Sequence, residues 1–108
     1  MKEKKIEFIA HAVRWFDKVN GNTYHSVRIE RVKDGAILKS SPIIYGYGDH
    51  YRQTAIDLMI ENNWIPSKYG KKQTNGGNLG YMFERENGYP IYWDVRDGLK
   101  REMKANVS

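Results

Sequence analysis

The chain contains no cysteine among its 108 residues. Disulfides, zinc sites with thiolate ligands and thiol catalysis are therefore excluded, and a reducing compartment is compatible with the composition. Long hydrophobic runs are also missing, because the first apolar stretch is broken at His11 and Arg14. A secretion signal needs about 7–15 apolar residues and a membrane span about 20, so we expect a soluble, cytoplasmic protein without either.

Metal-binding and catalytic motifs are not recognisable. His11, His25 and His50 show none of the HxH, HxxxH or HExxH spacings that metal sites use. No pattern of nucleophile, base and orienting group can be read from the sequence. We therefore expect no metal, no cofactor and no catalytic residue. The adjacent pair Asp49 and His50 leaves a small hydrolase-like enzyme open as a third hypothesis.

Positive charge is in excess. Eighteen Lys and Arg residues against thirteen Asp and Glu residues give a formal net charge of +5. Such a balance favours anionic partners, either nucleic acid or an acidic protein surface. It is also common in soluble proteins that bind neither, so charge alone leaves both interpretations open.

The length and the hydrophobic pattern predict one domain, residues 1–108. Asn-Gly pairs at 20–21 and 87–88 are typical of hairpin turns. We predict an α+β fold, with an antiparallel sheet of about five strands in the order βββαββ and one main helix packed on one face. The expected strands are 6–17, 23–33, 36–45, 79–84 and 89–95, and the expected helix is 50–63.

Several finer features follow from single residues. Asp49 is a good N-cap for the main helix, and Pro42 places the third strand at an edge of the sheet or breaks it. Residues 67–78 are expected to form a flexible, basic, glycine-rich loop. Residues 100–108 are expected to be a polar tail, with an optional short helix over 96–105.

The first hairpin predicts two chemically different faces. With a two-residue turn at Asn20-Gly21, Phe16 lies opposite His25. Trp15, Tyr24 and Arg28 then share an open face, which can stack bases and hold phosphates or bind a protein. Alternatively, Trp15 and Tyr24 are covered by the loop or the C-terminal segment. The expected core face carries Phe8, Ala10, Ala12, Phe16, Val27 and Ile29.

The glycine-rich loop adds a second group of candidate binding residues. Lys68, Tyr69, Lys71 and Lys72 form a basic prong that can hold phosphates. The competing interpretation is a solvated lysine loop.

Two segments carry a resemblance. WFDKVNGNTYHSV (residues 15–27) and YGYGDHY (residues 45–51) resemble small uncharacterised proteins encoded by bacteriophages and prophages. The resemblance implies an accessory protein that acts in the bacterial cytoplasm. The layout is also similar to that of some anti-CRISPR and other anti-defence proteins, which act by occupying a binding surface. The basic charge differs from that of the acidic nucleic-acid mimics among them.

The leading hypothesis is a non-enzymatic, phage-type binding module that inhibits or modulates a host nucleic-acid-dependent defence system. Its partner would be a host protein or ribonucleoprotein complex, bound through Trp15, Tyr24, Arg28 and the lysine loop. The alternative is a simple RNA- or DNA-binding accessory protein that uses the same surface. An uncovered strand edge allows a monomer or a small homo-oligomer.

Overall fold

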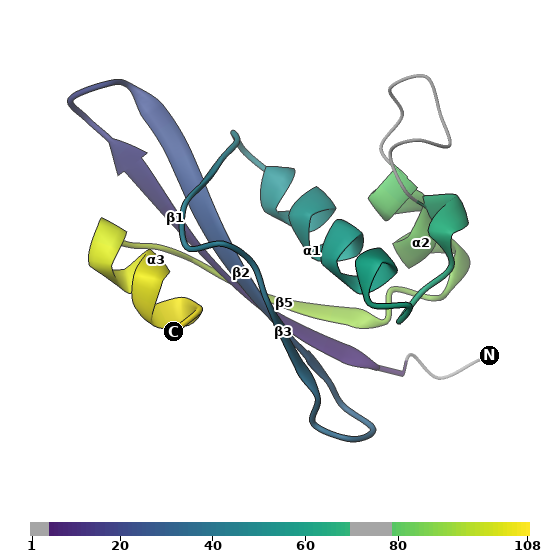
Figure 1. Ribbon diagram of the computed structural model, residues 1–108. Helices are drawn as coiled ribbons and strands as arrows, with labels where there is room; N and C mark the ends of the chain where they lie inside the picture. Colours follow the sequence, from purple (N-terminus) through teal and green to yellow (C-terminus); the bar gives the residue numbers. More distant parts are fainter. Residues whose placement is uncertain (1–4, 70–78) are drawn as a thin grey trace.

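The computed structural model describes residues 5–69 and 79–108 (Figure 1). A five-stranded sheet has the order β3-β2-β1-β5, and β4 also pairs with β2. The predicted α+β class, with one main helix on one face of the sheet, is confirmed. The strands are β1 (Phe8–Asp17), β2 (Asn22–Arg31), β3 (Ile37–Lys39), β4 (Ile44–Tyr45) and β5 (Ile91–Asp97).

Three α-helices and one short 3₁₀ helix surround the sheet (Figure 1). They are α1 (His50–Glu61), the 3₁₀ helix η1 (Ser67–Tyr69), α2 (Leu79–Glu86) and α3 (Lys100–Asn106). None of the helices within the described ranges combines the length and the apolar character that crossing a membrane requires.

The long β1–β2 hairpin is paired two residues away from the predicted register. Phe16 lies opposite Thr23 rather than His25, because the loop has four residues and not two. Asp17 Oδ1 accepts hydrogen bonds from the backbone N–H groups of Val19 and Asn20, and Gly21 closes the loop at φ +71°. A shift of two residues keeps every side chain on its predicted face, whereas a shift of one would exchange the faces.

The C-terminal half corrects two predictions. The sheet is mixed and not antiparallel, because β5 pairs in parallel with β1. The expected strand 79–84 belongs to helix α2, since a short run of alternating apolar residues fits either structure. Gly88 adopts φ +74°, and the N–H of Tyr89 donates to the carbonyl of Glu84 at 2.7 Å. Asn87-Gly88 therefore ends a helix with a left-handed cap, and no second hairpin forms.

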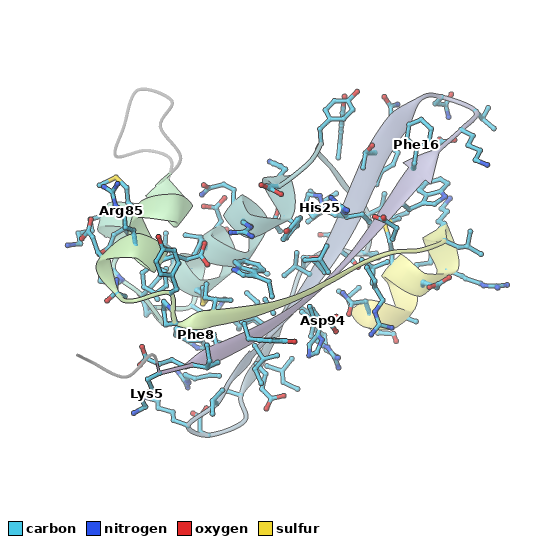
Figure 2. All side chains as sticks on the ribbon, turned by 180° about the vertical axis from the view of Figure 1, so that it is seen from behind. Lys5, Phe8, Phe16, His25, Arg85 and Asp94 are labelled. Carbon is cyan, nitrogen blue, oxygen red and sulfur yellow. The ribbon has the colours of Figure 1, made fainter. Side chains whose placement is uncertain are left out.

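The main core lies between the sheet and α1. Ala55, Ile56 and Met59 of α1 are fully buried. The sheet contributes the predicted residues with one exception: Phe16 is 54% exposed. Phe16 lies near the tip of the hairpin, far along β1 from the buried Phe8 (Figure 2). The predicted members that are buried in the core are Phe8, Ala10, Ala12, Val27 and Ile29.

The edge beside β2 is broken as predicted. β3 and β4 both pair with β2, and the segment between them contains Pro42. At the start of α1, Asp49 occupies the N-cap position, but its side chain makes no capping hydrogen bond. The predicted capping contact is therefore wrong.

The optional C-terminal helix is present as α3, so residues 100–106 are a docked helix rather than a polar tail. It packs on the face of the sheet opposite α1 (Figure 1), and Met103 is fully buried there. Ser26 Oγ donates to the Met103 carbonyl at 2.9 Å, and Asn106 Nδ2 donates to the His11 carbonyl at 3.0 Å. One buried apolar side chain and the hydrogen bonds of Ser26 and Asn106 thus hold a helix whose composition is otherwise polar.

Replacement of Met103 by alanine should test this docking. Met103→Ala removes a fully buried side chain, so we expect a loss of about 2–5 kcal/mol in the free energy of unfolding. Urea denaturation monitored by tryptophan fluorescence measures the change. Lys104→Ala, at an exposed position of the same helix, is the control and should change stability by less than about 0.5 kcal/mol. Equal stabilities for the two variants would contradict the docking.

Candidate functional site

The sheet face that carries α3 is organised in rows, because residues paired across neighbouring strands point to the same side. On the hairpin side of α3, Trp15 pairs with Tyr24 and Tyr24 pairs with Tyr45. We call these three residues, together with Tyr47, the aromatic row. On the other side of α3, a charged row crosses four strands and consists of Asp94, His11, Arg28 and Lys39.

The aromatic row is held together by ring contacts. The ring centroids of Trp15 and Tyr24 are 5.6 Å apart, and those of Tyr24 and Tyr45 are 5.8 Å apart. Tyr47 packs edge-on against Tyr45 at 5.5 Å, and the two hydroxyl groups hydrogen-bond at 3.0 Å. Lys100 Nζ, from the first turn of α3, lies 5.9 Å from the Trp15 ring centroid. The row therefore joins β1, β2, β4 and α3.

Solvent reaches the row unevenly. Trp15 and Tyr24 are half-buried, so the structure shows neither the open rings nor the covered rings that the sequence left as alternatives. Tyr45 is 47% exposed and Tyr47 is 60% exposed. Sequence reasoning missed both tyrosines as site residues. The available signal was their alternation in YGY, but the break at Pro42 hid the register that brings Tyr45 opposite Tyr24.

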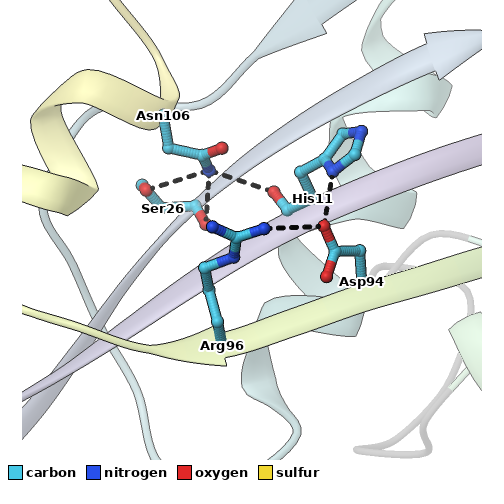
Figure 3. Close-up of polar contacts among 5 residues, drawn as sticks. All are labelled: His11, Ser26, Asp94, Arg96 and Asn106. Atoms are coloured by element: carbon cyan, nitrogen blue, oxygen red, sulfur yellow. Dashed lines mark hydrogen bonds and ion pairs between the residues drawn. The ribbon is translucent and has the colours of Figure 1, made fainter.

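The charged row contains an ordered ion pair. His11 Nδ1 lies 2.9 Å from Asp94 Oδ2, and Arg96 Nη2 lies 3.5 Å from the same oxygen (Figure 3). The hydrogen bond from His11, together with the charge of Arg96, lowers the pKa of Asp94 below its usual value. Asp94 is therefore a fixed negative charge that two neighbours already share.

Two residues of the predicted lysine loop, Lys68 and Tyr69, are described by the structure, and neither belongs to either row. Tyr69, predicted to bind a ligand, is 5% exposed and packs against Phe83 at 5.3 Å between ring centroids. It is therefore a core residue, and the prediction for Tyr69 is wrong. Lys68 is exposed beside Glu86 at the α2 end of the molecule, far from the hairpin tip (Figure 1). Lys71 and Lys72 lie outside the described residues.

Two histidines pack together beneath the N-terminus of α1. His25 is 1% exposed, its Nε2 lies 2.7 Å from Thr54 Oγ1, and its ring meets that of His50 at 5.4 Å. Burial, with a smaller contribution from the charge of His50, lowers the pKa of His25 to about 4. Gly46 is required here, because a Cβ at this position would lie 2.5 Å from His50 Nδ1.

The proposed acid–base pair of Asp49 and His50 has no support in this geometry. His50 Nδ1 is buried and has no hydrogen-bond partner in the described residues, whereas Asp49 is exposed. Nor do the ranges 5–69 and 79–108 contain a group of three or more His, Asp or Glu side chains that could hold a metal ion. The two rows beside α3 are therefore the stronger candidate sites.

Comparison with known proteins adds no family to this description. No protein-family model, curated protein or solved structure matches the chain. The similarity to phage-encoded proteins rests on the two sequence segments alone and stays a prediction.

The buried His25 gives a stability that depends on pH. The neutral imidazole is favoured in the folded state, so unfolded chains gain a proton near pH 6.5 that folded chains take up only near pH 4. The contribution of His25 is complete above pH 6.5 and is lost as the pH falls towards 4. Lowering the pH from 7 to 5 should therefore reduce the free energy of unfolding less for His25→Gln than for the unchanged protein. Urea denaturation at the two pH values measures the difference. A titration midpoint of His25 near 6.5 by NMR would contradict the prediction.

Proposed function

We propose that this protein is a nucleic-acid-binding module that holds unpaired bases on the aromatic row. The observation that carries the proposal is a continuous series of four rings across one sheet face, with two of them 47% and 60% exposed. Aromatic side chains on a sheet surface bind single-stranded nucleic acid by stacking, with little dependence on sequence.

The charge distribution supports an anionic ligand at this row. Lys100 lies directly beside Trp15, and Arg101 and Lys104 are exposed on the same helix. Lys18 is exposed in the hairpin loop next to the row. Cations beside a stacking surface contact the phosphates while the rings contact the bases. The formal net charge of +5 acts in the same direction.

The packing of the row also favours tight stacking. Each ring already touches a neighbour, and the Tyr45–Tyr47 hydrogen bond fixes the most exposed end. Side chains that are immobile before binding lose less conformational entropy when a base arrives. The preference is for single strands, because the bases of a duplex are already stacked on one another.

The two exposed tyrosines provide the direct test. Tyr47→Ala and Tyr45→Ala should each weaken binding of a fluorescent oligodeoxythymidylate by about 5- to 150-fold, which corresponds to roughly 1–3 kcal/mol per stacked base. Fluorescence anisotropy at several salt concentrations measures the affinity, which should fall steeply as salt rises. Tyr92→Ala is the control, because Tyr92 is 59% exposed on β5 and lies outside the row. Absence of binding at low salt, or equal effects in all three variants, would sink the proposal.

Inhibition of a host defence system stays a prediction from the phage resemblance, and it requires a protein target. A pull-down with tagged protein from bacterial lysate, with and without nuclease, separates the two functions. If the aromatic row binds nucleic acid, the molecules that the unchanged protein recovers and Tyr47→Ala does not should be absent from the pull-down after nuclease treatment. A host complex that survives nuclease and still depends on Tyr47 would instead favour the inhibitor and contradict nucleic acid as the ligand.

A further inference from the structure

Arg28 is a partly buried cation without a hydrogen-bond or ion-pair partner among residues 5–69 and 79–108. Its Nε atom is buried and has no hydrogen-bond acceptor in the described part of the chain. A buried donor left unpaired costs free energy, and a buried charge costs more. Four other arginines each have a carboxylate partner: Arg14 with Asp97, Arg31 with Asp34, Arg52 with Glu84, and Arg96 with Asp94.

The side chain of Arg28 lines a cavity of about 300 Å³ between α3 and the sheet. This volume lies at the lower end of the range for small-molecule sites. His11, Arg96 and Asn106 line the same cavity, so most of the polar groups around it are hydrogen-bond donors or can become donors. Figure 3 shows His11 and Arg96 against Asp94, and Asn106 of α3 against the carbonyl of His11.

The carboxylates of this cavity are already engaged. Asp94 interacts with both His11 and Arg96. Glu102 Oε1 accepts a hydrogen bond from the backbone N–H of Leu99 at 3.3 Å, at the start of α3. Lys39 is paired with Arg28 across β2 and β3, but its Nζ atom donates to the backbone oxygen of Ser108 at 2.9 Å. Of the arginines that line the cavity, Arg28 is therefore the one without a carboxylate partner in the described chain.

We propose that the cavity binds a phosphate group, with Arg28 as its principal ligand. A guanidinium presents parallel N–H donors that match two oxygens of an oxyanion. Donors from His11 and Arg96 approach from other strands, and a phosphate has more oxygens to accept them than a carboxylate has. Either inorganic phosphate or the terminal phosphate of a nucleotide supplies this chemistry. The site is independent of the aromatic row, since α3 separates the two.

Titration with inorganic phosphate at constant ionic strength tests the site. Saturable NMR shifts are expected at His11, Asn106 and the Arg28 Nε–H, and phosphate should raise the melting temperature. Arg28→Gln should weaken binding by about tenfold or more, since a charged hydrogen-bond pair is lost. It should fold at least as stably as the unchanged protein in phosphate-free buffer, because it removes a buried Nε–H donor that has no acceptor in the described residues.

Lys33→Gln is the matched control, because it removes one positive charge from an exposed position in the turn between β2 and β3, outside the lining of the cavity. It should leave phosphate affinity within about twofold, whereas equal weakening in both variants, or shifts that never saturate, would overturn the site. Titrations with adenosine monophosphate and adenosine distinguish the two sources of the phosphate group. Tighter binding of the monophosphate than of inorganic phosphate indicates a nucleotide. Equal binding of the two indicates free phosphate. Tyr47→Ala should not alter phosphate affinity. A failure of the phosphate site can therefore be distinguished from a failure of the aromatic row.

Discussion

The pairing of β1 with β2 determines the chemistry of both faces. Ten consecutive residue pairs, from Phe8–Arg31 to Asp17–Asn22, lock the two strands together. One face of this ribbon carries the residues buried beneath α1, such as Ala12 and Val27, whereas the other face carries His11, Trp15, Tyr24 and Arg28 beside the apolar Ile9 and Val13. Trp15, Tyr24, His11 and Arg28 therefore owe their shared face to the parity of this one ladder.

Helix α3 divides the second face of the sheet into two halves, one with the aromatic row and one with the charged row. It covers the middle of the sheet through Met103 and is fixed by hydrogen bonds to Ser26 and from Asn106. The rings lie at its N-terminal end, next to Lys100, and Arg28 lies in the cavity beside Asn106, in its last turn. A short helix that buries a single large side chain thus separates the proposed stacking surface from the proposed phosphate pocket.

The sequence predicted the parts of this structure that depend on local patterns. Strand periodicity, the break at Pro42 and the helix after Asp49 are local, and the faces of the hairpin tolerated an error of two residues in register. Features that depend on contacts between distant parts of the chain could not be predicted. Asn87-Gly88 fits a hairpin and a helix cap equally well, and the docking of α3 depends on one methionine among charged residues. Tyr45 and Tyr47 joined the site only through tertiary pairing with Tyr24.

The parallel pairing of β1 with β5 joins Phe8 to Ile91, residues from opposite ends of the chain. Contacts between such distant residues form slowly, because a long loop must close before they become favourable. During synthesis, β1 has only β2 as a neighbour until the last fifth of the chain has left the ribosome. Its second edge is open to other strands for that period, so the nascent hairpin is the state most prone to misassociation.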